Sequence, residues 1–421
     1  MTSFTKPKKK PGEGPHYPEL VKLAVQRALN DATISKKDIE QAVVGNVFVG
    51  GGVGQRSLYE AGIFNIPIFN VANACATGSN ALILARNFIA GGLNECALAV
   101  GVEKMKPGSL GGDAGGAKGP TSLDFHFHVM AKTHGIARAP PMPQMFGNAG
   151  REHSKLYGTT PKQFAMVAEK NHRHSKNNPY AQFRDTYTLE EIEKSREVYA
   201  PLNKLECSPT SDGAAAAIVC SEDFVRRHGL EGQAVEIVGQ AMTTDDRTAF
   251  STKSHERSAI DMVGFKMAQD CADQVYAMSG IGPDRVDVVE LHDCFSCNEL
   301  ISYEALRLCG EGEGGKLIEN GDCTFGGKYV VNPSGGLISK GHPLGATGLA
   351  QCAELNWQLR NEAGPRQVRG AKVALQHNLG LGGACVVTMY KRPEEWRGIP
   401  PKRKASGAMG FGSDAQKRSR L

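Results

Sequence analysis

At residues 74–86 the chain reads ACATGSNALILAR, and at residues 344–356 it reads LGATGLAQCAELN. Both stretches contain Ala-Thr-Gly followed by small and apolar residues, which is typical of the start of a buried helix. The segments ahead of them also match, because 17–47 and 262–292 each contain a long amphipathic helix, a turn and a strand. We therefore predict that the chain contains two copies of one α/β unit.

Strand-like runs continue this pattern on both sides of the two stretches. Examples are IPIFNV (66–71), CALAVG (96–101), VDVVELH (286–292) and AKVALQ (371–376). Helical stretches lie between most of these runs. Near-continuous apolar strands that alternate with helices indicate α/β layers, with sheets buried on both faces.

Two features interrupt the duplication. The block between Lys104 and Leu205 has no counterpart in the second half, so we interpret it as an insertion. The strand 234–240 precedes Ala-Met-Thr in the second half, whereas the matching Met-Thr-Ser starts the chain. The first copy therefore lacks its opening strand, which we expect to be internal in the sheet, where its loss would leave backbone groups unpaired. Either another element fills the place, or the sequence is a shortened isoform or a gene product with a mis-assigned start.

The domain boundaries follow from this organisation. Residues 1–103 and 205–233 form the N-terminal half, 104–204 the inserted loop domain and 234–392 the C-terminal half. Residues 393–421 are polar and basic, and we expect a disordered tail.

The composition argues against several classes of protein. Of the 421 residues, 40% are hydrophobic and 22% are charged, as in soluble globular proteins, and no apolar run approaches the ~18 residues of a membrane span. The net charge of +5 lies largely in the tails and does not indicate nucleic-acid binding. The 11 cysteines are odd in number, and no secretory signal is present, so we expect free thiols in a reducing compartment. Cys294 and Cys297 form a CxxC pair without a second pair, so we expect no metal.

Cys75 is the candidate nucleophile, because it follows a strand and opens a helix. The first N–H groups and the dipole of a helix favour an anion, so we expect the thiol of Cys75 to be shifted toward thiolate, the reactive form. Taken alone, a cysteine beside alanine and glycine can also be a small buried residue.

His342 lies just before the matching helix of the second half. If the two halves are related by a pseudo-twofold axis, both helix starts face one site, and His342 can accept the proton of Cys75. His292 and Cys294 follow the strand that ends at 292, which is the favoured position for sites in parallel sheets. Gly380 lies in HNLGLGG (377–383), a glycine-rich turn whose backbone N–H groups can bind an oxyanion.

These segments together resemble the thiolase family from Met1 to about Arg392. The motifs that carry the resemblance are NVANACATGSNA, SPTSDGAAAAI, ELHDCFSCNEL, GGLISKGHPLGATG and LQHNLGLGGA. General thiolases have Asn-Glu-Ala-Phe where this chain has HDCF, and Cys-x-Gly where it has Asn378-Leu379-Gly380. Both departures match the sterol-carrier subgroup, whose acid/base cysteine comes from HDCF. Cys385 lies too late to replace the missing cysteine.

The resemblance implies a five-layer α-β-α-β-α thiolase fold and cleavage of a 3-oxoacyl-coenzyme A. The Cys75 thiolate attacks the 3-oxo carbon, and Cys294 protonates the enolate that leaves. His292 and His342 form an oxyanion hole for the enolate, and the N–H groups of Cys75 and Gly380 form one for the tetrahedral intermediate. Coenzyme A is a cosubstrate, and neither a metal nor a nicotinamide cofactor is required.

The resemblance also implies contacts with coenzyme A from the inserted domain. Met145 and Phe146 are expected near the acyl or pantetheine channel, and Arg173 and Ser339 are further candidates for binding. Arg173 belongs to a predicted basic cluster with Lys170, His172, His174 and Lys176. That cluster either contacts phosphates or is a solvated helix face.

The final residues, Ser-Arg-Leu, are a variant of the peroxisomal Ser-Lys-Leu signal. They predict a peroxisomal enzyme of lipid breakdown that is recognised by the import receptor. The subgroup suggests straight and 2-methyl-branched substrates, and the family suggests a homodimer.

Two alternatives remain open from sequence alone. A non-catalytic acyl-coenzyme A or lipid-binding protein is suggested by the absent strand. A biosynthetic condensing enzyme is suggested because that superfamily shares the Cys and His geometry.

Overall fold

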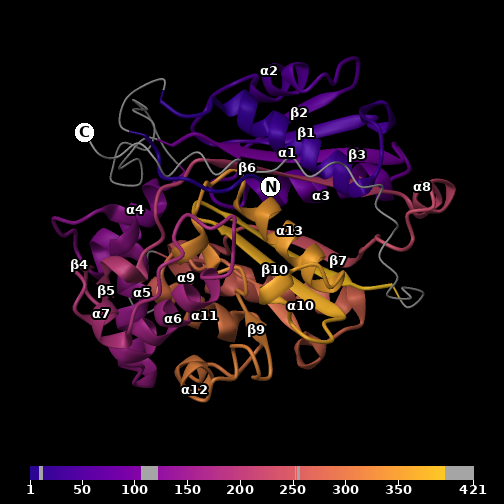
Figure 1. Cartoon of the computed structure of the whole chain (residues 1–421). Helices are drawn as coiled ribbons and strands as arrows, with labels where there is room; N and C mark the ends of the chain where they lie inside the picture. Colours follow the sequence, from indigo (N-terminus) through magenta and orange to yellow (C-terminus); the bar gives the residue numbers. More distant parts are fainter. Residues whose placement is uncertain (9–12, 106–121, 252, 254–256, 394–421) are drawn as a thin grey trace, which may run out of the picture.

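A computed structural model describes residues 1–8, 13–105, 122–251, 253 and 257–393. Two β-sheets are separated by a layer of two helices, and further helices cover their outer faces (Figure 1). This arrangement confirms the five layers that the resemblance implied. Among the described residues, no helix is long and apolar enough to cross a membrane.

The N-terminal sheet has the order β2-β1-β3-β6. Its strands are β1 (Gln41–Gly45), β2 (Ile68–Val71), β3 (Cys96–Glu103) and β6 (Gly213–Cys220). β1 is parallel to β2 and β3, whereas β6 is antiparallel to β3. Helices α1 (Tyr17–Ala32) and α2 (Val53–Glu60) cover the outer face, and their apolar residues pack on the strands.

The C-terminal sheet has the order β7-β11-β10-β8-β9. Its strands are β7 (Glu236–Thr243), β8 (Val288–Glu290), β9 (Val330–Val331), β10 (Val373–Gly380) and β11 (Ala384–Lys391). β10 and β11 are fully buried except at the end of β11, as expected for a sheet covered on both faces. The outer helix α10 (Phe265–Ser279) packs on β7 and β11.

The two sheets match strand for strand, and the match corrects one expectation. β6, β3, β1 and β2 correspond to β11, β10, β8 and β9, and β7 has no counterpart among the described residues. β7 lies at the edge of its sheet, beside β11. The expectation that the missing strand is internal is therefore wrong, because the corresponding place is the outer edge of β6.

The central layer consists of α3 (Thr77–Ala90) and α13 (Thr347–Leu359), and each contacts both sheets. Their N-terminal turns cross at two glycines. A Cβ added at Gly78 would lie 3.0 Å from the Gly348 nitrogen, and one added at Gly348 would lie 2.4 Å from the Ser79 nitrogen. Only glycine permits this approach, so the shared Ala-Thr-Gly brings the two helix starts together.

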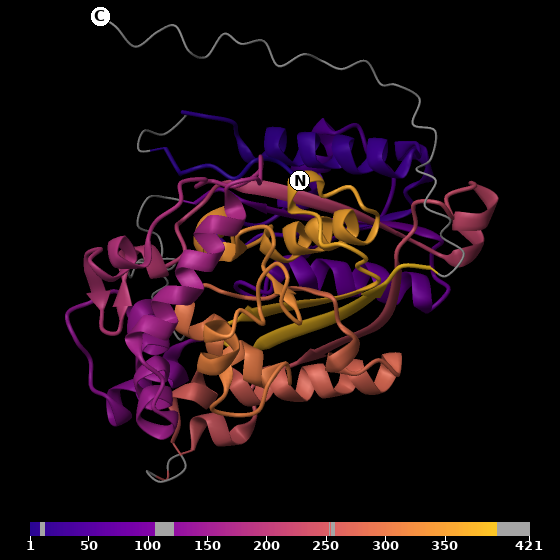
Figure 2. The ribbon, with the colours of Figure 1, turned by 60° about the horizontal axis from the view of Figure 1, so that its bottom comes forward.

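The inserted block lies to one side of both halves (Figure 2). It contains α4 (Asp124–Thr133), α5 (Pro141–Tyr157), α6 (Pro161–Ser175), α7 (Leu189–Glu193), β4 (Glu197–Tyr199) and β5 (Leu202–Asn203). The remaining helices are α8 (Glu222–Arg227), α9 (Ala259–Met262), α11 (Ser296–Ala305) and α12 (Gly314–Glu319). The predicted disordered tail, with its Ser-Arg-Leu ending, lies outside the described residues apart from its first position.

Candidate active site

Cys75 lies in a tight turn immediately before α3. Ala74 has a positive φ of 46°, an uncommon conformation for a residue with a Cβ that is frequent at functional sites. Thr77 closes the turn, because its hydroxyl donates to the Ala74 carbonyl at 2.6 Å and accepts the Asn73 N–H at 2.8 Å. The Cys75 side chain is left half-buried.

Gly380, at the end of β10, packs directly against this turn. A Cβ at Gly380 would lie 2.4 Å from the Asn73 carbonyl oxygen and 3.0 Å from the Ala76 nitrogen. Glycine is therefore needed for the two backbones to meet. The structure brings Gly380 beside Cys75, as the oxyanion-hole prediction requires, although no bound oxyanion tests that role.

His342 is held in one orientation by the start of α13. Its backbone N–H donates to the Ser211 hydroxyl at 3.0 Å, and its Nδ1 lies 2.7 Å from the Thr347 hydroxyl oxygen. Because the Thr347 hydroxyl donates to the Pro343 carbonyl at 3.0 Å, it accepts a proton from Nδ1. We therefore assign the Nδ1–H tautomer to His342. Its Nε2 lone pair has no partner among the described residues.

His292 follows β8 and is assigned the opposite tautomer. The Asn378 side-chain nitrogen lies 3.3 Å from His292 Nδ1, and the Ser79 hydroxyl donates to Asn378 Oδ1 at 2.9 Å. The amide of Asn378 is thus oriented with its NH₂ group toward the ring. His292 Nδ1 is then an acceptor, and Nε2 carries the proton.

A longer network fixes the direction of these bonds. Gln376 donates to the Ser79 hydroxyl at 2.8 Å and to the Gly348 carbonyl at 2.7 Å, and Tyr390 donates to Gln376 Oε1 at 2.6 Å. In this network each side chain can be oriented in only one way that gives every donor an acceptor. The sequence did not identify Ser79, Gln376 or Tyr390, because they come from separate elements that meet only in the folded chain.

The reactive groups converge at the centre of the molecule. Cys75 Sγ and one ring nitrogen each of His292 and His342 lie within 4.8 Å of one another. The two imidazole rings are 5.2 Å apart between centroids, at 76°. One ring offers a free lone pair and the other an N–H donor, so the site can accept the thiol proton and also stabilise a negative oxygen. The same three groups could hold a metal ion, and the absence of a metal stays a prediction.

Burial changes the expected charge state of these groups. Burial raises the pKa of Cys75 to about 12, with a smaller contribution from the Glu103 carboxylate. Burial lowers the pKa of His342 to about 3 and that of His292 well below its usual range. The expectation of a resting thiolate is therefore wrong, because the effect of burial on the Cys75 pKa outweighs the lowering effect of the backbone at the start of α3. Cys75 and His342 rest as a neutral thiol and a neutral imidazole.

Cys294 is buried, and it lies close enough to Cys75 for their charges to interact. Burial raises the pKa of the Cys294 thiol well above its usual value, followed by the nearby Cys75. A protonated thiol at this position suits a proton donor. The neighbouring Asp293 accepts the N–H groups of Leu337 at 2.7 Å and Ile338 at 3.2 Å. It thereby ties the His292 loop to the segment that carries His342.

The predicted coenzyme A residues differ in their surroundings. Met145 and Phe146 are buried in α5, and the Phe146 ring lies 5.0 Å from that of Phe295, beside the HDCF loop. The Ser339 hydroxyl is bonded within the protein, to Ser175 at 2.6 Å and to the Phe183 carbonyl at 3.2 Å. Arg173 is exposed and pairs with Glu169 at 3.0 Å. Binding of coenzyme A by these residues stays a prediction.

The predicted basic cluster does not form. Lys170 is buried and pairs with Glu299, and it also donates to the Val331 carbonyl at 3.1 Å. His174 is buried against the Asn332 carbonyl at 3.0 Å. Neither the phosphate contact nor the solvated face applies to these residues, because this side of α6 faces the C-terminal half.

Comparison with known proteins agrees with this geometry. The family described as "Thiolase, N-terminal domain" matches residues 1–223, and "Thiolase C-terminal domain-like" matches residues 248–390. Sterol carrier protein 2 of Rattus norvegicus is 56% identical over 393 residues, covering 93% of this chain and 70% of the rat protein. Acetyl-CoA acetyltransferase of Methanothermobacter thermautotrophicus is 36% identical, covering 89% of this chain and 94% of the other.

The fold has also been seen in solved structures. The structure titled "Ltp2-ChsH2(DUF35) aldolase" superposes with a TM-score of 0.78 at 22% identity, covering 94% of this chain and 97% of the other. At that identity the likeness shows the fold alone. The family matches and the rat relative go further, and by them the chain belongs to the thiolase family and is of the sterol-carrier type.

Proposed function

We propose that this chain cleaves 3-oxoacyl-coenzyme A with coenzyme A as cosubstrate, without a metal or nicotinamide cofactor. The observation that carries the proposal is the pair of opposite tautomers around Cys75. His342 presents a free Nε2 lone pair, and the network through Asn378 leaves an N–H on the far nitrogen of His292. A binding protein has no need of an acceptor and a donor arranged around a thiol.

The first half-reaction begins with proton transfer. Nε2 of His342 takes the Cys75 proton as the sulfur attacks the 3-oxo carbon, so charge forms only as the new C–S bond does. The N–H groups of Cys75 and Gly380 stabilise the oxyanion, and loss of one such donor typically costs about 10²–10³ in rate. Cleavage of the C2–C3 bond then releases the enolate of acetyl- or propanoyl-coenzyme A. His292 and the protonated His342 bind its oxygen, and Cys294 protonates C2.

The second half-reaction restores the enzyme. The Cys294 thiolate takes the proton of an incoming coenzyme A thiol, which attacks the acyl-Cys75 thioester. The tetrahedral intermediate collapses, Cys75 leaves, and it regains its proton from His342. The product is an acyl-coenzyme A shortened by the released unit.

The physiological setting extends this proposal. Straight and 2-methyl-branched 3-oxoacyl chains are the proposed substrates, and a homodimer is the proposed assembly. The Ser-Arg-Leu ending supports import into peroxisomes by the receptor for such signals, where the chain would act in β-oxidation of fatty acids and sterol side chains.

The test is coenzyme A-dependent consumption of a 3-oxoacyl-coenzyme A, combined with mass spectrometry of the acylated protein. Wild-type protein should turn over and carry an acyl group on Cys75. Cys75→Ala should lose both signals, whereas Cys309→Ala should keep them. Saturable binding without an acyl adduct would instead support the non-catalytic alternative, and elongation with a malonyl donor would support the condensing enzyme.

A further inference from the structure

The thiol and the two imidazoles at the centre of the molecule are spaced like the ligands of a metal ion. Cys75 Sγ and one ring nitrogen each of His292 and His342 lie within 4.8 Å of one another, and in the part of the chain that the structure describes no other three such ligands lie so close. In a tetrahedral zinc site the corresponding atoms are roughly 3.4–3.6 Å apart, because Zn–N bonds are about 2.0–2.1 Å long and Zn–S bonds about 2.3 Å. Small side-chain rotations can supply the remaining approach, which is at most about 1.4 Å.

These ligands select the class of cation. A thiolate and two imidazoles suit a borderline-soft divalent ion such as Zn²⁺, whereas Mg²⁺ and Ca²⁺ require oxygen ligands. The Glu103 carboxylate lies close enough to Cys75 to oppose a thiolate charge, and the same negative charge favours a bound cation. Lys340, whose charge acts on His342, is already paired with Glu290 at 2.9 Å.

His342 is already in the form that binds a metal ion. Its Nδ1–H donates to the Thr347 hydroxyl at 2.7 Å, so the lone pair of Nε2 is available for a ligand. Histidines that bind a metal almost always donate their other ring N–H in this way. His342 therefore needs no change of tautomer on binding.

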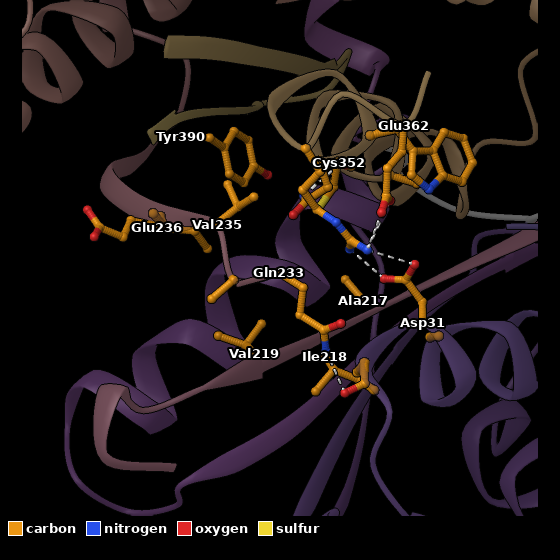
Figure 3. Close-up of a pocket in the computed structure, with 18 of the residues that line it drawn as sticks. Asp31, Ala217, Ile218, Val219, Gln233, Val235, Glu236, Cys352, Glu362 and Tyr390 are labelled. Atoms are coloured by element: carbon orange, nitrogen blue, oxygen red, sulfur yellow. Dashed lines mark hydrogen bonds and ion pairs between the residues drawn. The ribbon is translucent and has the colours of Figure 1, made fainter. Parts of the chain in front are cut away.

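His292 is in the opposite form, and Asn378 keeps it there. The Asn378 amide donates to Nδ1 of His292 at 3.3 Å, which leaves the ring proton on Nε2, the nitrogen that a metal ion would need. The amide is held in this orientation, because its oxygen accepts the Ser79 hydroxyl at 2.9 Å. The network that orients Ser79 ends at Tyr390, which lines a separate groove together with Cys352 (Figure 3). Binding of a metal ion must therefore move the His292 proton to Nδ1 against the NH₂ group of Asn378.

We propose that this thiol and the two imidazoles form an inhibitory site for Zn²⁺, and that Asn378 limits the affinity of the site. On binding, the Cys75 thiol releases its proton to solvent and a Zn–S bond forms. The proton of His292 moves through solvent from Nε2 to Nδ1, and Nε2 of both rings binds the ion. Because the proposed thiolytic reaction uses no metal, an ion that holds Cys75 and His342 blocks the nucleophile and its base together. The inhibition rests on the proposed function, whereas the binding does not.

Titration with Co²⁺, a spectroscopic substitute for Zn²⁺, tests the site without turnover. The wild-type protein should show the visible bands of tetrahedral Co²⁺ and a sulfur-to-cobalt charge-transfer band, and Zn²⁺ should displace both. Cys75→Ala should lose the charge-transfer band and bind more weakly by at least about tenfold. Alkylation of Cys75 by iodoacetamide, followed by mass spectrometry, should stop at saturating Zn²⁺ and recover on addition of a chelator.

The role of Asn378 is tested by the same titration. Asn378→Asp places a carboxylate where it accepts a proton from Nδ1 of His292, so Zn²⁺ should bind about 10–100 times more tightly. Asn356→Asp adds the same charge on α13, where Asn356 lines the separate groove, and should bind like wild type. Thr347→Val should weaken binding by about tenfold, because His342 loses the acceptor that holds its proton on Nδ1.

Three results would overturn the proposal. The first is the absence of saturable binding of Co²⁺ or Zn²⁺ by the wild-type protein. The second is equal affinity of Cys75→Ala and wild type, which would mean an adventitious ion held elsewhere. The third is equal affinity of Asn378→Asp and wild type or, if circular dichroism shows that Asn378→Asp is unfolded, of Thr347→Val and wild type. Because none of these measurements uses turnover, they distinguish a failure of this proposal from a failure of the proposed thiolytic activity.

Discussion

α3 and α13 both begin with Ala-Thr-Gly, and in both the threonine hydroxyl donates to a carbonyl of the preceding turn. Thr77 donates to Ala74 at 2.6 Å, and Thr347 donates to Pro343 at 3.0 Å. In α3 the hydroxyl also accepts a backbone N–H and so tightens the turn that presents Cys75. In α13 it lies against the ring of His342 and sets its tautomer.

The comparison shows which residues a duplicated unit keeps. The threonine and the glycine are scaffold residues, because the first closes the turn and the second lets the two helices cross. The reactive side chain differs, with a thiol before one helix and an imidazole before the other. Substitutions at these positions should therefore separate the scaffold residues from the reactive ones.

His342→Ala should lower kcat/KM by about 10³, because Cys75 then has no acceptor for its proton and general acid–base groups contribute 10²–10⁴. The formation of acyl-Cys75 in a single turnover should slow by a similar factor. His134→Ala, at the end of α4, is the matched control and should be unaffected. A loss below tenfold would show that another group accepts the thiol proton.

Gly348→Ala should lower the free energy of unfolding by about 3 kcal/mol, because the new Cβ would lie 2.2 Å from the Ser79 hydroxyl oxygen. Urea denaturation measures this change. Gly51→Ala is the control, since a Cβ there meets nothing within 4 Å. Equal stability of the two variants would mean that the helices can separate at no cost.

Alkylation of Cys75 by iodoacetamide should rise about tenfold per pH unit between pH 7 and 10, or about 10² from pH 7 to 9, because the thiolate fraction grows by that factor below the pKa. The sign follows from burial, which favours the neutral thiol and raises its pKa to about 12. Labelling of Cys75→Ala gives the background from other cysteines. A plateau below pH 8 would show a depressed pKa and restore the resting thiolate.

Asn378→Ala should lower kcat by about 10–10², less than the 10²–10³ typical of one lost oxyanion donor, because the imidazole of His292 itself remains; KM should change little. Without the amide donor, His292 is free to move its proton to Nδ1. Asn378→Asp should be as damaging despite its similar shape, because a carboxylate accepts a proton from Nδ1. Nitrogen-15 NMR of the ring reports the tautomer directly, and Asn356→Asp is the control. An unchanged spectrum would remove Asn378 from this positioning role.

Thr347→Val should lower kcat/KM by up to about tenfold, because one hydrogen bond typically contributes about 1 kcal/mol. Thr77→Val should act mainly on stability, since Thr77 bonds only to the backbone. Kinetics and urea denaturation of both variants separate the two effects. Equal kinetic losses would mean that the two threonines do not differ in role.

The sequence was most informative where a property is local. The duplication, the thiolase family and the α/β layers were all predicted correctly, because helix periodicity, apolar strands and short motifs are written in consecutive residues. Cys75, His292, Cys294 and His342 were selected in the same way. The fold brings Cys75, His292 and His342 together, and Cys294 lies near enough to Cys75 to interact with its charge. Their catalytic roles remain predictions.

The sequence was least informative where burial and pairing decide. Lys170 looks like a surface residue in a basic helix, yet it is buried against Glu299. The Cys75 thiol looks activated by a helix start, yet desolvation outweighs that effect. The missing strand was expected inside a sheet, whereas strand order places it at an edge.

The family and the repeated unit could be read from the amino-acid sequence, and so could the candidate reactive side chains, since each depends on residue types at short spacing. The tautomers of His292 and His342 and the neutral resting state of Cys75 became visible only in the tertiary structure. Those properties depend on hydrogen-bond partners and solvent exclusion contributed by segments hundreds of residues apart, such as Ser79 and Asn378. No local sequence pattern predicts which distant residues will form hydrogen bonds in the folded chain.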